Sequence, residues 1–99
     1  MVIETKKNEQ ELVVEFTGRL DTNTAPTLAQ TINENTDGGI DKLVLDLKNL
    51  EYISSAGLRV LLATQKRIKD VGSMKLINVC EDVMEVFEMT GFADILTIE

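Results

Sequence analysis

An apolar run that leads through two serines into a helical pattern constrains the fold of this chain more than any other stretch of its 99 residues. Residues 43–47 are almost continuously apolar, which is typical of a strand covered on both faces. Residues 49–53 are interpreted as a short loop, and a helical pattern then runs from Ser55 to Gly72, a residue type that commonly ends helices. A strand followed directly by a helix favours a parallel sheet, because parallel neighbours need a crossover connection.

The first part of the chain predicts a β-hairpin. Residues 2–6 have the pattern of a short edge strand, and a polar turn separates them from residues 11–17. In this second segment Leu12, Val14 and Phe16 alternate with more polar residues, as in a strand that is buried on one face.

Further strand and helix patterns complete an α/β chain. Apolar residues at helical spacing from Ala25 to Ile32 predict an amphipathic helix, which residues 37–39 end. A strand over residues 74–79 precedes a helix over residues 81–90, and the final apolar segment fits either a last strand or a last helical turn. We therefore expect one α/β domain over the whole chain, with a mixed sheet of four to five strands, an N-terminal hairpin and parallel strands joined by helices.

The helical spacing also predicts which side chains face the sheet. Leu58, Leu61 and Leu62 fall near one face of the central helix, and Phe87 and Thr90 near one face of the last helix. The same central helix carries basic residues on its other faces. We interpret them as a solvated surface, and the alternative is a basic strip for an acidic partner. These residues are Arg59, Lys66, Arg67 and Lys69.

Charge and composition exclude several classes of function. The formal net charge is −7, whereas nucleic-acid binding depends on clustered Lys and Arg, so we expect no nucleic-acid partner. The chain has no histidine, which excludes Ser-His-Asp and Cys-His catalysis and removes the commonest metal ligand. A single cysteine excludes a thiolate cage, so we expect no metal and no cofactor.

The lone Cys80 fits a reducing compartment and the role of a small buried apolar residue at a strand end. No signal-peptide pattern opens the chain, and no apolar run has the length of a membrane span. We expect a cytoplasmic protein without direct membrane insertion.

Two kinds of side chain are candidates for chemistry. A serine at a helix start can cap the helix, or it can receive a phosphate at the positive end of the helix dipole. Asp21, Asp46 and Glu51 are conceivable as an acid/base set, but solvated or capping roles fit a chain with 17 acidic residues better. The chain lacks a Gly-rich phosphate loop, and we expect no enzymatic activity. If the second and third strands are parallel, Asp21 and the serine pair lie at the same edge of the sheet.

Three motifs in order carry a resemblance to a known family. They are Gly18-Arg19-Leu20-Asp21, Ile53-Ser54-Ser55-Ala56-Gly57-Leu58 and Met89-Thr90-Gly91-Phe92. Over essentially the whole chain, their order and spacing resemble the STAS-domain family, and more narrowly the bacterial anti-sigma-factor antagonists.

The resemblance implies a phosphorylation switch. In that family an anti-sigma kinase phosphorylates the serine that corresponds to Ser55, the unphosphorylated antagonist binds this kinase and frees a sigma factor, and a PP2C-like phosphatase resets the cycle. Asp21 matches the family's acidic residue near the phosphorylated serine. Ser54 replaces a common aspartate and becomes a second possible acceptor, and Ala56 stands where Ser or Thr is frequent.

The resemblance thus implies a partner-binding loop formed by Asp21, Ser54, Ser55, Ala56, Gly57 and Arg59. The alternative function is a constitutive STAS subunit of a transporter complex or signalling scaffold, in which Ser55 is only a helix cap.

Overall fold

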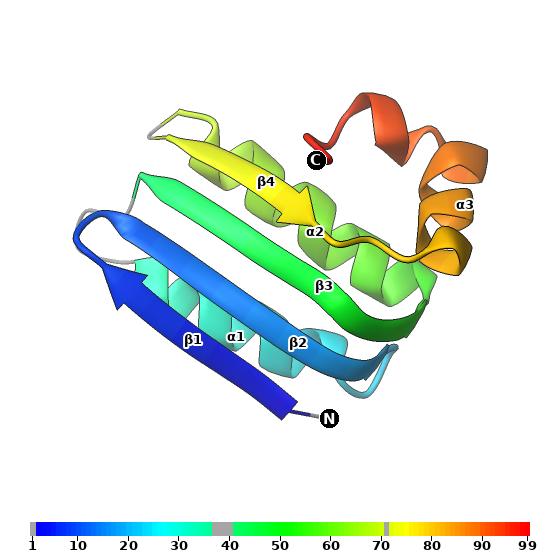
Figure 1. Cartoon of the computed structure of the whole chain (residues 1–99), viewed down its shortest axis with the longest axis horizontal. Helices are drawn as coiled ribbons and strands as arrows, with labels where there is room; N and C mark the ends of the chain where they lie inside the picture. Colours follow the sequence, from blue (N-terminus) through cyan, green and yellow to red (C-terminus); the bar gives the residue numbers. More distant parts are fainter. Residues whose placement is uncertain (1, 37–40, 71) are drawn as a thin grey trace.

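The computed structural model describes residues 2–36, 41–70 and 72–99. Its strands form one mixed sheet in the order β1 (Val2–Asn8), β2 (Glu11–Leu20), β3 (Lys42–Ile53) and β4 (Ser73–Ile77). β1 and β2 are antiparallel, whereas β3 runs parallel to both β2 and β4 (Figure 1). The predicted α/β fold, with its hairpin and its parallel strands joined by helices, is confirmed.

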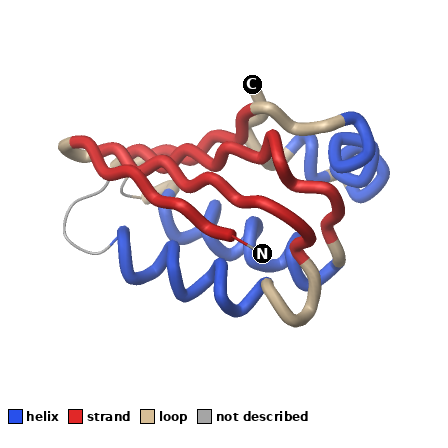
Figure 2. The backbone as a smooth tube through the Cα atoms, turned by 60° about the horizontal axis from the view of Figure 1, so that its bottom comes forward, coloured by secondary structure: helices blue, strands red, loops and turns tan. Residues whose placement is uncertain are grey.

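The helices lie on one face and at one end of the sheet. α1 (Ala25–Thr36) and α2 (Ser55–Ile68) cover the same face. The opposite face, which we call the outer face, carries no helix of the described residues (Figure 2). α3 (Glu81–Thr90) lies near the end of β3, and a short 3₁₀ helix (Phe92–Asp94) follows it. None of these helices is long and apolar enough to cross a membrane.

The core lies between the sheet and the two covering helices. Leu12, Val14 and Phe16 of β2 face it, as their alternation predicts. The largest fully buried side chains come from every layer of the fold, namely Phe16, Phe87, Leu12, Leu20, Leu28, Ile32, Leu43, Leu45, Leu50, Leu61, Leu76 and Val14.

Strand β3 differs from its prediction in two ways. It continues to Ile53, so the predicted loop over residues 49–53 is wrong, and β2 likewise continues past residue 17. Residues 43–47 are buried, yet helices cover only one of their faces. On the outer face Val44 and Asp46 lie between side chains of the two neighbouring strands, which shield them from solvent.

Three predictions for the helices are also corrected, two on buried faces and one on the end of α2. Leu61 is fully buried as predicted, but Leu62 is only half-buried, and Thr90 is exposed with its hydroxyl bonded to the Val86 carbonyl. α2 ends at Ile68 rather than at Gly72. A glycine is needed at position 72 for another reason, since a Cβ there would collide with the Asp41 carbonyl oxygen.

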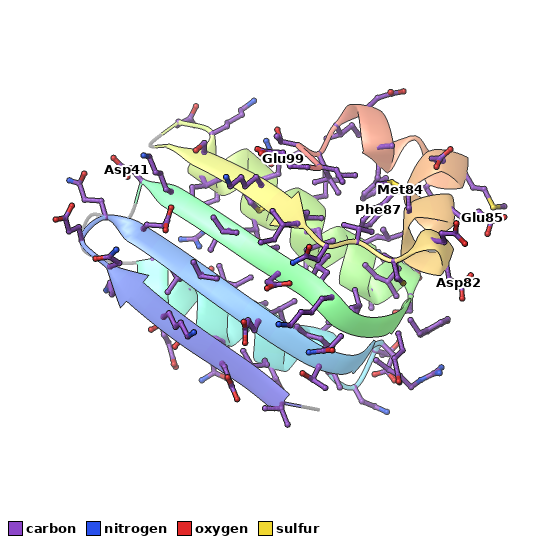
Figure 3. The ribbon with its side chains drawn as sticks, viewed as in Figure 1. Asp41, Asp82, Met84, Glu85, Phe87 and Glu99 are labelled. Atoms are coloured by element: carbon purple, nitrogen blue, oxygen red, sulfur yellow. The ribbon has the colours of Figure 1, made fainter. Side chains whose placement is uncertain are left out.

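The last helix separates apolar from acidic side chains. Phe87 is fully buried, whereas Asp82 and Glu85 point away from the domain (Figure 3). Beyond it the chain returns to the sheet, where Ile98 forms a single parallel bridge with Leu76 of β4. The final segment is therefore neither a full strand nor a helical turn. The predicted end of the first helix at residues 37–39 lies outside the described residues.

Candidate functional site

The candidate site lies at the carboxyl edge of the parallel strands. Leu20 and Ile53, the last residues of β2 and β3, are register partners, and the Ser54 N–H donates to the Leu20 carbonyl at 2.9 Å. The residues that follow, Asp21 and Ser54, therefore begin adjacent loops. The structure places the predicted loop residues together because β2 and β3 are parallel.

Asp21 organises the turn between β2 and α1. Its Oδ1 accepts hydrogen bonds from the N–H groups of Asn23 at 2.9 Å and Thr24 at 3.1 Å. The Thr24 hydroxyl in turn donates to the Arg19 carbonyl at 2.7 Å, which closes the turn. The Thr24 N–H is the main cause of a lowered pKa for the Asp21 carboxyl, against a smaller opposing effect of desolvation. Asp21 is thus an ionised, half-buried turn residue beside the serines.

We expect Asp21→Asn to reduce the acid sensitivity of the fold. A carboxyl whose folded pKa lies below its ordinary value of 3.8 stabilises the native state above that pH, and this contribution disappears as the pH falls through the folded pKa. Urea midpoints measured from pH 7 down to pH 2.5 should therefore fall more steeply for the wild type than for the variant. Parallel curves would show that the Asp21 charge does not stabilise the turn.

The two serines have different positions. Ser54 is the N-cap of α2, with extended backbone (φ −99°, ψ 176°), and its side chain accepts from the Gly57 N–H at 3.5 Å. Ser55 is the first residue of the helix and is exposed. The cap is therefore Ser54 and not Ser55, because β3 continues to Ile53 and leaves Ser54 as the residue between strand and helix.

The two small residues after the serines let α2 begin close to the sheet. Gly57 is buried, and a Cβ there would lie 2.8 Å from side-chain atoms of both Ile53 and Leu20. Ala56 is half-buried against the core. Glycine at position 57 therefore allows the helix N-terminus, with Ser55, to sit directly over the ends of β2 and β3.

Arg59 lies one helical turn after Ser55 and is exposed. It lines a groove of about 320 Å³ between α1 and α2, together with Ala29, Asn33 and Ala63. At the far end of this groove Arg67 donates to the Thr36 hydroxyl at 2.7 Å, so this arginine joins the two helices as well as facing solvent.

Sequence reasoning missed two contributors to this edge. The Arg19 guanidinium lies 4.3 Å from the centroid of the Tyr52 ring, and these two residues are register partners near the strand ends. The signal was present in the matching orders Arg19-Leu20 and Tyr52-Ile53. It was missed because the predicted second strand ended at residue 17 and Tyr52-Ile53 was assigned to a loop. Cys80, half-buried at the start of α3, is the second contributor, since its thiol donates to the Leu50 carbonyl at 3.5 Å.

The three carboxylates considered for acid/base chemistry do not converge. Asp46 is 8 % exposed on the outer face, where its Oδ1 accepts from the Asn78 amide at 3.1 Å. It precedes the end of β3 by seven residues, which is about 23 Å of strand. Glu51 is exposed and Asp21 belongs to the turn described above.

Within residues 2–36, 41–70 and 72–99 no group of three or more acidic or thiol side chains could hold a metal ion.

A four-stranded α/β domain with a serine-opened helix at the carboxyl edge of its sheet is the class of protein that this geometry defines. The family model of the STAS domain matches residues 2–99, and the chain therefore belongs to the STAS-domain family.

Curated relatives specify the branch of this family. The chain is 35 % identical to the anti-sigma-B factor antagonist of Bacillus subtilis (strain 168), over 97 % of this chain and 88 % of that protein. It is 26 % identical to the anti-sigma-B factor antagonist of Staphylococcus aureus (strain NCTC 8325), over 97 % and 90 %. Proteins of this branch, the anti-sigma factor antagonists, are regulators rather than enzymes.

Solved structures agree on the fold. An anti-sigma factor antagonist from Mycobacterium paratuberculosis superposes with a TM-score of 0.87 at 26 % identity, covering 98 % of this chain and 83 % of that one. The Bacillus cell fate determinant SpoIIAA in its phosphorylated form gives a TM-score of 0.77 at 17 % identity, covering 99 % and 91 %.

Proposed function

We propose that this chain is an antagonist switched by phosphorylation of Ser55. Unmodified, it binds an anti-sigma kinase and so frees a sigma factor; phosphorylated, it releases the kinase, and a PP2C-like phosphatase restores the first state. It acts in the cytoplasm as a single domain over residues 1–99.

The observation that carries this proposal is the division of roles between the two serines. Ser54 is committed to the helix, because its side chain accepts the Gly57 N–H and its carbonyl accepts the Leu58 N–H at 3.0 Å. Ser55 is exposed, and its hydroxyl makes no hydrogen bond to any described residue. Position 55 therefore offers an accessible hydroxyl whose modification leaves the helix cap in place.

The chemistry at this hydroxyl is a simple phosphoryl transfer. The Ser55 Oγ attacks the γ-phosphorus of ATP, the bond to the ADP oxygen breaks, and the hydroxyl proton passes to a base of the kinase. The free N–H groups at the start of α2 favour the product, because they point toward added negative charge. A protein of the same fold, the Bacillus cell fate determinant SpoIIAA, also has a solved structure in a phosphorylated form.

We expect one phosphate, on Ser55, after incubation with the cognate kinase and Mg-ATP. Peptide mass spectrometry of the wild type, Ser55→Ala and Ser54→Ala provides the test. Ser55→Ala should remove the modification without loss of a cap, whereas Ser54→Ala should keep it and lose about 1 kcal/mol of stability.

Two results would contradict this assignment. Phosphate mapped to Ser54 would move the switch by one residue, and undiminished phosphorylation of folded Ser55→Ala would exclude the site altogether.

A further inference from the structure

The described residues outside the four strands protect one edge of the sheet and leave the other open. On β4 the C-terminal segment pairs with Leu76, whose N–H donates to the Thr97 carbonyl at 2.9 Å and whose carbonyl accepts from the Glu99 N–H at 2.9 Å. On the other edge β1 pairs with β2 alone, and in Figure 1 no described element lies beyond it. An open edge presents unpaired N–H and C=O groups that can accept another strand.

The charges of β1 complement one another when the strand pairs antiparallel with itself. In such a pair, facing side chains lie on the same side of the sheet. When the outer faces of both copies form one continuous face, even-numbered residues therefore face even-numbered residues. With Thr5 opposite Thr5, all seven residues of β1 overlap and Glu4 faces Lys6 in both directions. The next register on one side places Glu4 opposite Glu4, and the next on the other side places Lys6 opposite Lys6.

Lysines on an edge strand normally prevent pairing. Here they select a register, because the alignment with the greatest overlap is also the one in which opposite charges meet. β1 is well suited to this role, since Ile3 is its only half-buried residue and the other six are exposed.

A second observation on the outer face concerns the carboxylates next to Glu4. Glu4 lies directly opposite Glu15 of β2, and Glu15 lies opposite Asp46 of β3, so three carboxylates form a row across the sheet. Like charges directly opposite one another destabilise a sheet. Within the described ranges the ion pair is that of Lys75 and Glu99, at the far edge. Lys6 of a second copy would occupy the free side of Glu4.

We propose that β1 pairs antiparallel with β1 of a second copy, about a two-fold axis at Thr5, and joins two four-stranded sheets into one. Such an isologous contact closes on itself and stops at the dimer. This association needs none of the residues of the serine loop, because Asp21 and Ser55 lie in other elements. It can therefore succeed or fail independently of the proposed phosphorylation switch.

Sedimentation velocity over a concentration series at physiological ionic strength tests the dimer. We expect the wild type to shift from monomer to dimer as concentration rises. Glu4→Lys and Lys6→Glu should each weaken dimerisation by about tenfold or more, because each puts like charges opposite one another at two symmetric positions. An equimolar mixture of the two variants should recover the dimer, and so should the double variant E4K/K6E.

Lys48→Glu is the matched control, since it makes the same change of charge at an exposed position of β3. It should leave the dimer unchanged. A wild type that remains monomeric at every concentration would overturn the proposal. So would a dimer that Lys6→Glu does not weaken, or variants with native circular dichroism whose mixture stays monomeric.

Discussion

Phosphoserine at position 55 is expected to weaken binding to the anti-sigma kinase by roughly a hundredfold or more, because like-charge contact across an interface costs several kcal/mol. The modification adds close to two negative charges at an exposed position. The Asp21 carboxylate lies in the adjacent loop, and the chain already has a net charge of −7. Titration calorimetry of the unmodified chain and of the chain with phosphoserine inserted genetically at position 55 measures the difference.

Three variants separate the effect of the site from the effect of charge alone. Ser55→Ala should bind like the wild type, since Ser54 still caps α2. Ser55→Glu should weaken binding less than phosphoserine, because it adds one charge rather than nearly two. Ser73→Glu adds the same charge at an exposed position at the start of β4, the opposite end of the parallel strands, and should bind like the wild type. Equal affinities for all forms would instead support a constitutive STAS interaction subunit.

The order of elements was predictable because most strands and helices show clean periodicity. Leu12, Val14 and Phe16 alternate as a strand buried on one face must, and all three are buried. The glycine at position 91 has the left-handed backbone (φ 82°) that commonly ends a helix, and α3 ends there. Local pattern and global fold agree in these segments.

The end of β3 was not predictable, because extra residues in β3 break its alternation where it pairs with β2. The pairing shifts register between Glu15 and Thr17, and again between Gly18 and Arg19, and each shift gives β3 one residue more than β2. As a result the buried positions Leu47, Leu50 and Ile53 are spaced by three rather than two. Such spacing departs from the period of two that identifies a strand, and the segment was assigned to a loop.

This error carried over to the candidate site. A loop over residues 49–53 leaves the identity of the helix cap open, whereas a strand that continues to Ile53 makes Ser54 the cap and exposes Ser55. The grouping of Asp21 with the serines was predictable, because it needed only the parallel arrangement of β2 and β3. The Arg19–Tyr52 contact was not, because it depends on the register after the second shift.

Leu61→Ala is expected to destabilise the domain by about 2–5 kcal/mol, the range found when a fully buried leucine leaves a cavity. Leu61 is 0 % exposed and lies on the side of α2 that packs on the sheet. Small domains are stable by only about 5–15 kcal/mol, so this loss would remove a large part of the free energy of unfolding. Urea midpoints of the wild type and the variant, with m-values as a check on two-state unfolding, give the free energy of unfolding.

Leu62→Ala is the matched control for this prediction, because it removes the same atoms from the next position of the same helix. Leu62 is only half-buried, so its loss should cost about 1 kcal/mol. Equal losses at positions 61 and 62 would mean that a different face of α2 packs on the sheet, and the exposure of Ser55 and Arg59 would then need to be reassigned.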